Sequence, residues 1–99
     1  MKLAKYLQAE KKEFVLSKQV LRSGTAIGAL VREAQHAESR ADFIHKMSIA
    51  LKEADETLYW LELLRSSEYI ESHSFESVHA DGEQLLKLLV TIVKTSKGA

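Results

Sequence analysis

The sequence predicts an all-α protein folded as an antiparallel up-down four-helix bundle. The 99 residues contain no proline and only four glycines, so the chain has few positions at which to turn. Apolar residues recur at steps of three and four along most of the chain, which is the period of an amphipathic helix. The segments between these stretches are short, and helices joined by short loops pack antiparallel. We expect a single domain, 1–99, with helices at about 1–10, 14–37, 40–65 and 74–96.

The composition excludes several classes of protein. Hydrophobic residues make up 45% of the chain and charged residues 28%, as in globular domains. There is no cysteine, which excludes disulfides, thiolate metal sites and a cysteine nucleophile. No apolar run approaches the roughly 18 residues of a membrane span. Lys2 and Lys5 also interrupt the start, where a signal peptide needs an apolar core. We therefore expect a cytoplasmic protein without a membrane partner.

The first two helices differ greatly in length. The first has Leu3, Tyr6 and Leu7 at helical spacing but spans fewer than three turns, so it must depend on packing against the rest of the protein. The segment 11–13 is the expected connection. The second helix has an unbroken apolar stripe made of Leu16, Val20, Ser23, Ile27, Leu30, Ala34 and Ala37.

Small residues in the middle of the second helix indicate close packing. Ser23 and Ile27 belong to its stripe, and Gly24 and Gly28 lie beside that stripe. A glycine inside a helix costs about 1 kcal/mol relative to alanine, so a compensating contact is expected. We predict that another helix approaches closely at these four residues.

The third helix has the clearest pattern in the chain. Ser39, followed three residues later by Asp42, predicts a capped start. The stripe follows the a/d spacing of helices packed at a shallow angle. It consists of Phe43, Met47, Ala50, Ala54, Thr57, Leu61 and Leu64.

Several large apolar residues of the third helix fall outside this stripe, namely Ile49, Tyr59, Trp60 and Leu63. A helix that is apolar nearly all round is central or has a second interface. Because large aromatics dominate interface energetics, we predict a subunit interface at Tyr59, Trp60 and Leu63. The alternative is that Trp60 seals the core of its own bundle.

The fourth helix follows a segment, 65–73, in which the apolar period is lost. We expect Tyr69 and Ile70 to fold back onto the bundle and Ser72 or Ser74 to cap the next helix. Asp81 and Gly82 are compatible with a turn, but the pattern stays in phase across them and favours a continuous helix. The stripe is Phe75, Val78, Leu85, Leu89 and Ile92.

The net charge is zero but unevenly distributed. Residues 1–32 hold seven Lys or Arg against two acids, and residues 33–83 hold twelve acids against four bases. Such separation suits a polyanionic partner or the pairing of opposite faces of neighbouring subunits. For RNA or DNA, the candidate is an outward basic row on the second helix, Lys11, Lys18, Arg22 and Arg32, extended by His36. The alternatives are solvated helix faces, or pairing of Arg22 with Glu33, Glu56 or an acid of the adjacent subunit.

The sequence offers little for catalysis or metal binding. Two Glu-x-x-His sequences, Glu33 to His36 and Glu76 to His79, match a ligand pattern of metal-binding helical bundles, with Glu56 as a further ligand. The predicted stripes place His36 and Glu76 away from the core, so their ligand atoms should not converge. No serine elbow, P-loop or carboxylate pair is present. We predict no enzymatic activity, cofactor, metal or small-molecule substrate.

The order of small and polar residues along the chain resembles that of a known protein family. The sequence is similar to the 23S rRNA intervening-sequence protein family. The similarity is carried by the run 19–29, by Glu33-Ala34 and Ala41-Asp42-Phe43, and by the stretch from 49–51 through Glu56-Thr57 to Trp60-Leu61. This resemblance implies an antiparallel four-helix bundle that assembles into a homo-oligomeric ring, usually a pentamer, with no established activity. It also implies a relation to accessory proteins of diversity-generating retroelements, whose basic ring engages nucleic acid. Members usually have a longer first helix.

Overall fold

The computed structural model describes residues 2–98, which form four α-helices and, within that range, no strand. They are α1 (Lys2–Ala9), α2 (Val15–Gln35), α3 (Arg40–Ser66) and α4 (Ser72–Gly98). Met1, which we placed in the first helix, lies outside the described residues. The helix α4 runs without interruption through Asp81 and Gly82, as its apolar phase predicted.

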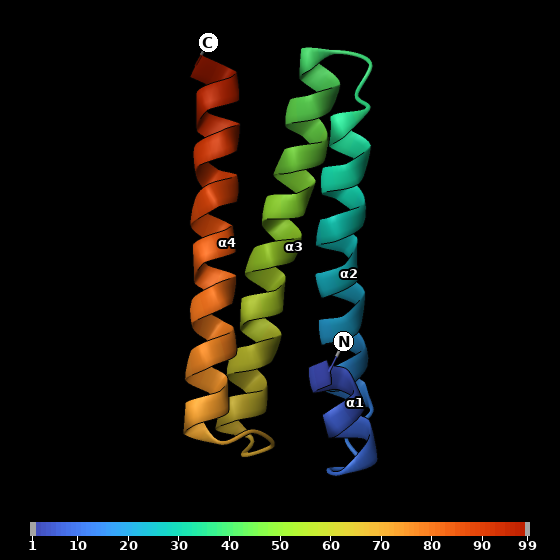
Figure 1. The fold of residues 1–99 in the computed structure, drawn as a ribbon, viewed down its shortest axis with the longest axis vertical. Helices are drawn as coiled ribbons and strands as arrows, with labels where there is room; N and C mark the ends of the chain where they lie inside the picture. Colours follow the sequence, from blue (N-terminus) through green and yellow to red (C-terminus); the bar gives the residue numbers. More distant parts are fainter. Residues whose placement is uncertain (1, 99) are drawn as a thin grey trace.

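The three long helices lie side by side, with α3 in the middle (Figure 1). The chain follows α2 upward in that view, returns down α3 and climbs again in α4, while α1 lies near the start of α2. Helix α3 packs against both α2 and α4, and α1 packs against α2. Within the described residues, no Cα atoms of α2 and α4 lie within 8 Å of each other. The third helix is therefore central, as its apolar distribution indicated.

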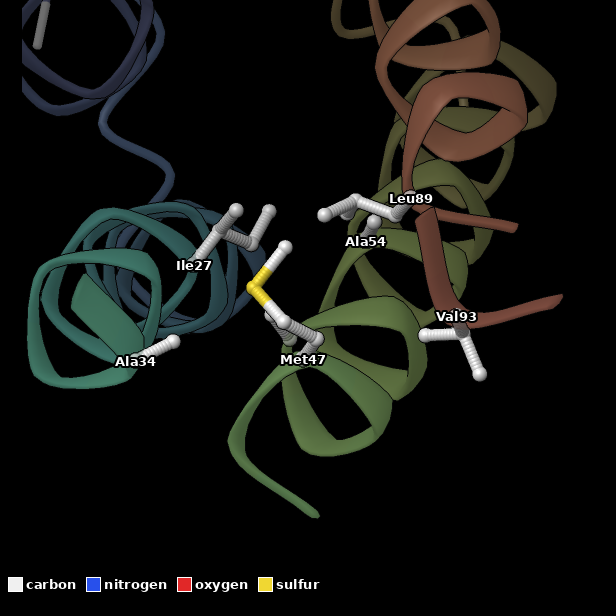
Figure 2. Close-up of a cluster of buried hydrophobic side chains, with 7 residues drawn as sticks. Ile27, Ala34, Met47, Ala54, Leu89 and Val93 are labelled. Carbon is white, nitrogen blue, oxygen red and sulfur yellow. The ribbon is translucent and has the colours of Figure 1, made fainter. Parts of the chain in front are cut away.

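The core consists of two clusters along the length of α3. The Met47 cluster joins α2, α3 and α4, and its buried members are Ile27, Ala34, Met47, Ala50, Ala54, Leu89 and Val93. Figure 2 shows Ile27, Met47 and Leu89 directed into the space between α2 and α4. The Leu61 cluster lies toward α1 and consists of Leu7, Val20, Leu58, Leu61, Leu64 and Ile70. Full burial of one such side chain contributes about 1.5–3 kcal/mol.

Helix α1 is held by tertiary packing and not by its own length. With eight residues it is far shorter than a helix that is stable alone. Leu7 is fully buried in the Leu61 cluster, and Ala4 is buried beside it. The amide of Glu13 donates to the carbonyl of Leu7 at 2.9 Å and closes the turn between α1 and α2.

Two side-chain caps fix where the long helices begin. The Ser39 hydroxyl accepts a hydrogen bond from the Asp42 amide at 3.0 Å, which confirms the predicted start of α3. Helix α2 is capped by Glu13, which the sequence reasoning had placed in a plain connection. Its carboxylate accepts from the amides of Val15, Leu16 and Ser17 at 3.1, 2.9 and 2.7 Å. A carboxylate at this end also complements the positive pole of the helix dipole.

The four residues of α2 that were predicted to pack closely lie in different surroundings. Ser23 and Ile27 are buried, and Gly24 is half-buried. Gly28, however, is exposed, and a Cβ built there would meet no heavy atom within 4 Å. The tight glycine is Gly82 of α4, where a Cβ would lie 2.7 Å from Cδ2 of Leu58. Of Gly28 and Gly82, therefore, only Gly82 lies where another helix comes close.

The predicted stripe of α4 also needs correction. Leu89 is buried as expected, but Val78 is 38% exposed. Gly82, which meets Leu58, and Val93, which is buried in the Met47 cluster, also lie on the face of α4 that packs against α3. The contact face is thus rotated away from Val78, because Gly82 allows the two helices to approach along the line on which it lies.

Candidate interaction surfaces

The structure divides the predicted basic row of α2. Lys11, Lys18 and Arg32 are exposed, as is His36. Arg22 instead turns toward α3, where its guanidinium pairs with Glu56 and, at 3.5 Å, with Glu53. Its side chain remains 51% exposed, but its charge is matched by two carboxylates. The row is therefore interrupted at its centre, which agrees with the alternative that Arg22 pairs with Glu56.

The basic charge gathers instead at the α1 end of the molecule. Five lysines there are exposed, namely Lys2, Lys5, Lys11, Lys12 and Lys18. Large apolar side chains are exposed among them, with Phe14 at 49%, Val15 at 71% and Leu21 at 36%. Phe14, Lys18 and Leu21 are spaced by four and three residues and so lie on one side of the chain at the start of α2. We call Phe14, Val15, Lys18 and Leu21 the α2 stripe.

A second exposed stripe runs along α4, with the opposite charge. Val78 is 38% exposed and Leu88 is 56% exposed. Asp81 is exposed between them, at helical spacing from both. We call Val78, Asp81 and Leu88 the α4 stripe. The two stripes belong to different helices, and Figure 1 shows α2 and α4 on opposite sides of α3.

The three residues predicted as a subunit interface differ in their exposure. Tyr59 is 53% exposed, whereas Trp60 packs against the Leu61 cluster and Leu63 is half-buried. The Tyr59 and Trp60 rings meet edge to face, with centroids 5.0 Å apart. Nε1 of Trp60 is buried without a hydrogen-bond acceptor in the described chain. Trp60 is half-buried and contacts its own bundle, and a subunit interface at Tyr59, Trp60 and Leu63 stays a prediction.

A polar contact joins α2 to α3 at the buried seam. The Ser23 hydroxyl donates to the carbonyl of Gln19 at 2.9 Å, one turn earlier, as is usual for serine inside a helix. The Thr57 hydroxyl lies 2.8 Å from the Ser23 oxygen and donates to it. The serine is fully buried, and these two hydrogen bonds satisfy its hydroxyl.

The Glu-x-x-His residues are drawn into other contacts. Glu33 pairs with Lys46 at 3.2 Å, and His36 is exposed. His79 lies between Glu62 and Glu83, while Glu76 is exposed. Across residues 2–98, no three His, Asp or Glu side chains gather in an arrangement able to hold a metal ion.

One surface hollow lies where the α3–α4 connection meets α1. Its volume is about 590 Å³, and its lining carries Lys11 and Arg65 together with Glu68 and Glu71. The mixture of two bases and two acids gives the hollow no strong preference for an ion of either sign. It supports no particular reaction.

No helix in residues 2–98 combines the length and the apolar character that crossing a membrane requires. The fold and the surfaces define an all-α helical protein with two exposed stripes on α2 and α4. The chain belongs to the 23S rRNA-intervening sequence protein family, whose model matches residues 1–91. This confirms the resemblance seen in the sequence.

A solved structure is closely similar to this chain. It is a crystal structure at 1.70 Å resolution of a protein with unknown function from the S23 ribosomal protein family of Bacteroides thetaiotaomicron VPI-5482. The two chains share 59% sequence identity and superpose with a TM-score of 0.92. The match covers 94% of this chain and 86% of that chain. A search of curated proteins found no match.

Proposed function

We propose that this chain is a non-enzymatic, cytoplasmic subunit whose antiparallel up-down bundle assembles with copies of itself into a homo-oligomeric ring. The observation that carries the proposal is the pair of exposed stripes. The α2 stripe combines Phe14, Val15 and Leu21 with Lys18, and the α4 stripe combines Val78 and Leu88 with Asp81. Each has an apolar part and a charge of opposite sign.

The positions of the stripes favour a ring over a two-fold dimer. A dimer with two-fold symmetry uses the same patch on both subunits, which would bring like charges together. Docking the α2 stripe of one copy on the α4 stripe of the next brings Lys18 toward Asp81 and buries the exposed apolar groups. Such a contact between different surfaces repeats around a closed ring when its rotation closes. A pentamer is the subunit number that the family resemblance implies.

The native mass and a charge exchange test the assembly. Light scattering should give a multiple of the 11.2 kDa subunit mass for the wild-type protein. Lys18→Glu and Asp81→Lys should each lower that mass, because each places like charges at the contact. The double variant should regain it, since the pair is restored with reversed polarity. Lys52→Glu, at an exposed position of α3, is the matched control and should leave the mass unchanged.

Other outcomes distinguish the competing arrangements. A wild-type mass of one subunit at all concentrations contradicts the assembly itself. If Tyr59→Ala dissociates the protein while the stripe variants do not, the interface lies on α3, where the sequence predicted it. Failure of the double variant to regain the mass of the wild type contradicts the pairing of Lys18 with Asp81.

The cluster of lysines at the α1 end favours a second candidate function, binding of RNA or DNA. Within the described residues, none of these five lysines has a carboxylate oxygen within 4.0 Å. Phe14 and Lys18 belong to the α2 stripe and would be covered in the proposed ring, so in the assembled protein this candidate depends on Lys2, Lys5, Lys11 and Lys12. Repetition of the cluster in an oligomer would add avidity to weak individual contacts.

Binding of a fluorescent single-stranded RNA, followed by anisotropy, tests this candidate. Affinity should fall steeply with added salt, because phosphate contacts release counterions. Lys11→Ala and Lys12→Ala, both outside the α2 stripe, should weaken binding more than Arg22→Ala, since Glu53 and Glu56 already pair with Arg22. Salt-independent binding, or an equal loss in all three variants, would contradict a surface built on the lysines.

A further inference from the structure

A second hollow lies between α1 and the beginning of α4, beside the hollow of mixed charge described above. Its volume is about 290 Å³, and its apolar walls are Leu3 and Tyr6 of α1, Ile70 of the α3–α4 connection and Val78 of α4. Tyr6 is 42% exposed and Val78 is 38% exposed, so the hollow is open to solvent. Within the described chain, no Cα atom of α1 lies within 8 Å of one of α4, which leaves this space between the two helices. We call it the α1–α4 hollow.

The α1–α4 hollow is continuous with the α4 stripe. Val78 belongs to both, and Ser74, another residue of its wall, lies one turn earlier on the same face of α4. Asp81 follows Val78 by three residues on that face. In the α2 stripe, Phe14 precedes Lys18 by four residues. Each surface therefore has an apolar feature first and a charged residue about one turn later, and the two charges are opposite.

The direction of the helices sets the register between two copies. Helices α2 and α4 run in the same direction within one molecule (Figure 1). Rotation about a ring axis that follows the bundle preserves this direction, so α2 of one copy and α4 of the next are parallel. At a rise of 1.5 Å per residue, Phe14 lies about 6 Å before Lys18. Val78 and Ser74 lie about 4.5 and 10.5 Å before Asp81 on the same basis. The pairing of Lys18 with Asp81 therefore brings Phe14 to the level of the hollow.

We propose that the ring of Phe14 enters the α1–α4 hollow of the neighbouring copy. This inference rests on the assembly proposed above, and it adds a specific anchor and a role for α1, which supplies one wall of the hollow. Phe14 is 49% exposed in the single chain, and burial of such a large apolar side chain is favourable. A cavity of about 150 Å³ is enough to hold benzene. The hollow, at about 290 Å³, therefore has room for the phenyl ring.

The charges around the ring and around the hollow favour the same docking. Lys11 and Lys12 precede Phe14 and are exposed. Glu71 is exposed on the wall of the hollow at the beginning of α4, whereas Lys2 is exposed on the α1 wall. Entry of Phe14 along α4 brings the two lysines of one copy toward Glu71 of the next. The contact thus extends the pairing of opposite charges by about two turns toward the α1 end.

Two variants that each damage one side of the contact test the proposal. Phe14→Ala removes the ring and leaves the hollow intact. Ser74→Trp fills the hollow from its own wall, at an exposed position, and leaves Phe14 intact. By light scattering, each variant alone should dissociate at a concentration at least about tenfold higher than the wild-type protein does. An equal mixture, at a concentration where each variant alone is a single subunit, should form a dimer of twice the 11.2 kDa subunit mass and nothing larger. Such a dimer has one intact contact and two damaged ends.

Further variants serve as controls for this experiment. Tyr59→Ala truncates an exposed aromatic ring on α3 and should assemble as the wild-type protein does. Tyr6→Ala removes part of the α1 wall and should behave like Ser74→Trp, forming a dimer with the variant that retains an intact hollow. Circular dichroism establishes that each variant is folded. If Ser74→Trp does not fold, Val78→Asp takes its place, because it puts a charge on the apolar wall at a partly exposed position.

The outcomes separate this inference from the assembly on which it rests. If Phe14→Ala assembles as the wild-type protein does, while the exchange of Lys18 and Asp81 behaves as proposed, the anchor is overturned and the ring stands. A mixture of the two variants that stays at the subunit mass also overturns the anchor, since the intact ring and the intact hollow should meet. Wild-type assembly of Tyr6→Ala overturns the role given to α1. A wild-type protein of one subunit at all concentrations overturns both proposals.

Discussion

Replacing Gly82 with alanine tests the close contact between α4 and Leu58 of α3. Two effects of this change oppose each other. Alanine is favoured over glycine inside a helix by about 1 kcal/mol. The new Cβ, however, would lie 2.7 Å from Cδ2 and 3.7 Å from Cγ of Leu58. No real Cβ contact is as short as the first distance, so Leu58 or the whole of α4 must move.

The surroundings of Leu58 decide which effect is larger. Cδ2 is the end of a flexible side chain, but Leu58 is 7% exposed and belongs to the Leu61 cluster, where its neighbours restrict rotation. Overpacking a well-filled core costs about 1–3 kcal/mol. We therefore expect Gly82→Ala to lower the free energy of unfolding by about 0–2 kcal/mol, the cost of overpacking less the gain in helix propensity.

Gly28→Ala is the matched control, because it adds the same methyl group to a helix with no neighbour within 4 Å. It should raise the free energy of unfolding by about 0.5–1 kcal/mol. Urea denaturation followed by circular dichroism measures both variants, with the native mass recorded in parallel. In a Leu58→Ala background, which opens space beside α4, Gly82→Ala should become stabilising. If Gly82→Ala stabilises the wild-type protein as much as Gly28→Ala does, the contact does not constrain α4 and the reasoning is refuted.

Three further changes test individual contacts. Glu13→Ala removes the acceptor at the start of α2 and should lower the free energy of unfolding by about 1–2 kcal/mol, measured by urea denaturation; an unchanged value contradicts the cap. Ser23→Ala deletes the acceptor used by Thr57 and should cost about 0.5–1.5 kcal/mol in the same assay, whereas a stabilised variant would show that this bond contributes nothing. Arg40→Ala removes two donors to the carbonyl of Ser96, at 3.0 and 2.6 Å. Amide exchange over 93–98 should then accelerate, and unchanged exchange would show that the arginine does not hold this end.

The number, order and approximate bounds of the helices followed from the sequence because the apolar period is long and uninterrupted. The cap at Ser39 was predictable as well, since a serine with an acid three residues later is a local signal. The cap at Glu13 was not, because glutamate is an uncommon residue at such a position and its three acceptor contacts depend on the fold of the turn.

The sequence was less informative about how each helix is rotated about its own axis. An apolar stripe shows which residues share a face of the helix. That face is wide, however, so the residues at its centre, which meet the neighbouring helix, cannot be identified from the stripe alone. On α4 the contact passes through Gly82 and leaves Val78 exposed. On α2 the neighbouring helix meets Ser23 and does not reach Gly28.

The candidate surfaces were only partly accessible to sequence reasoning. Lys11, Lys18 and Arg32 were correctly expected at the surface, because charged side chains rarely lie in a core. The pairing of Arg22 with Glu53 and Glu56 depends on the register of α2 against α3, and several acids of α3 were equally available in the sequence. For the same reason the position of His79 between two carboxylates could not have been read from its Glu-x-x-His sequence.

The central position of α3 affects how the chain can fold. Each of the packed pairs, α1 with α2, α2 with α3 and α3 with α4, joins helices that follow one another in the sequence. No such pair requires a long loop to close, and chains dominated by local contacts fold rapidly. We expect the α2–α3 hairpin to form first and α4 to dock onto it afterwards. Damage to the face of α3 that meets α4 would then leave a partly folded hairpin with its apolar side exposed, and such states aggregate readily.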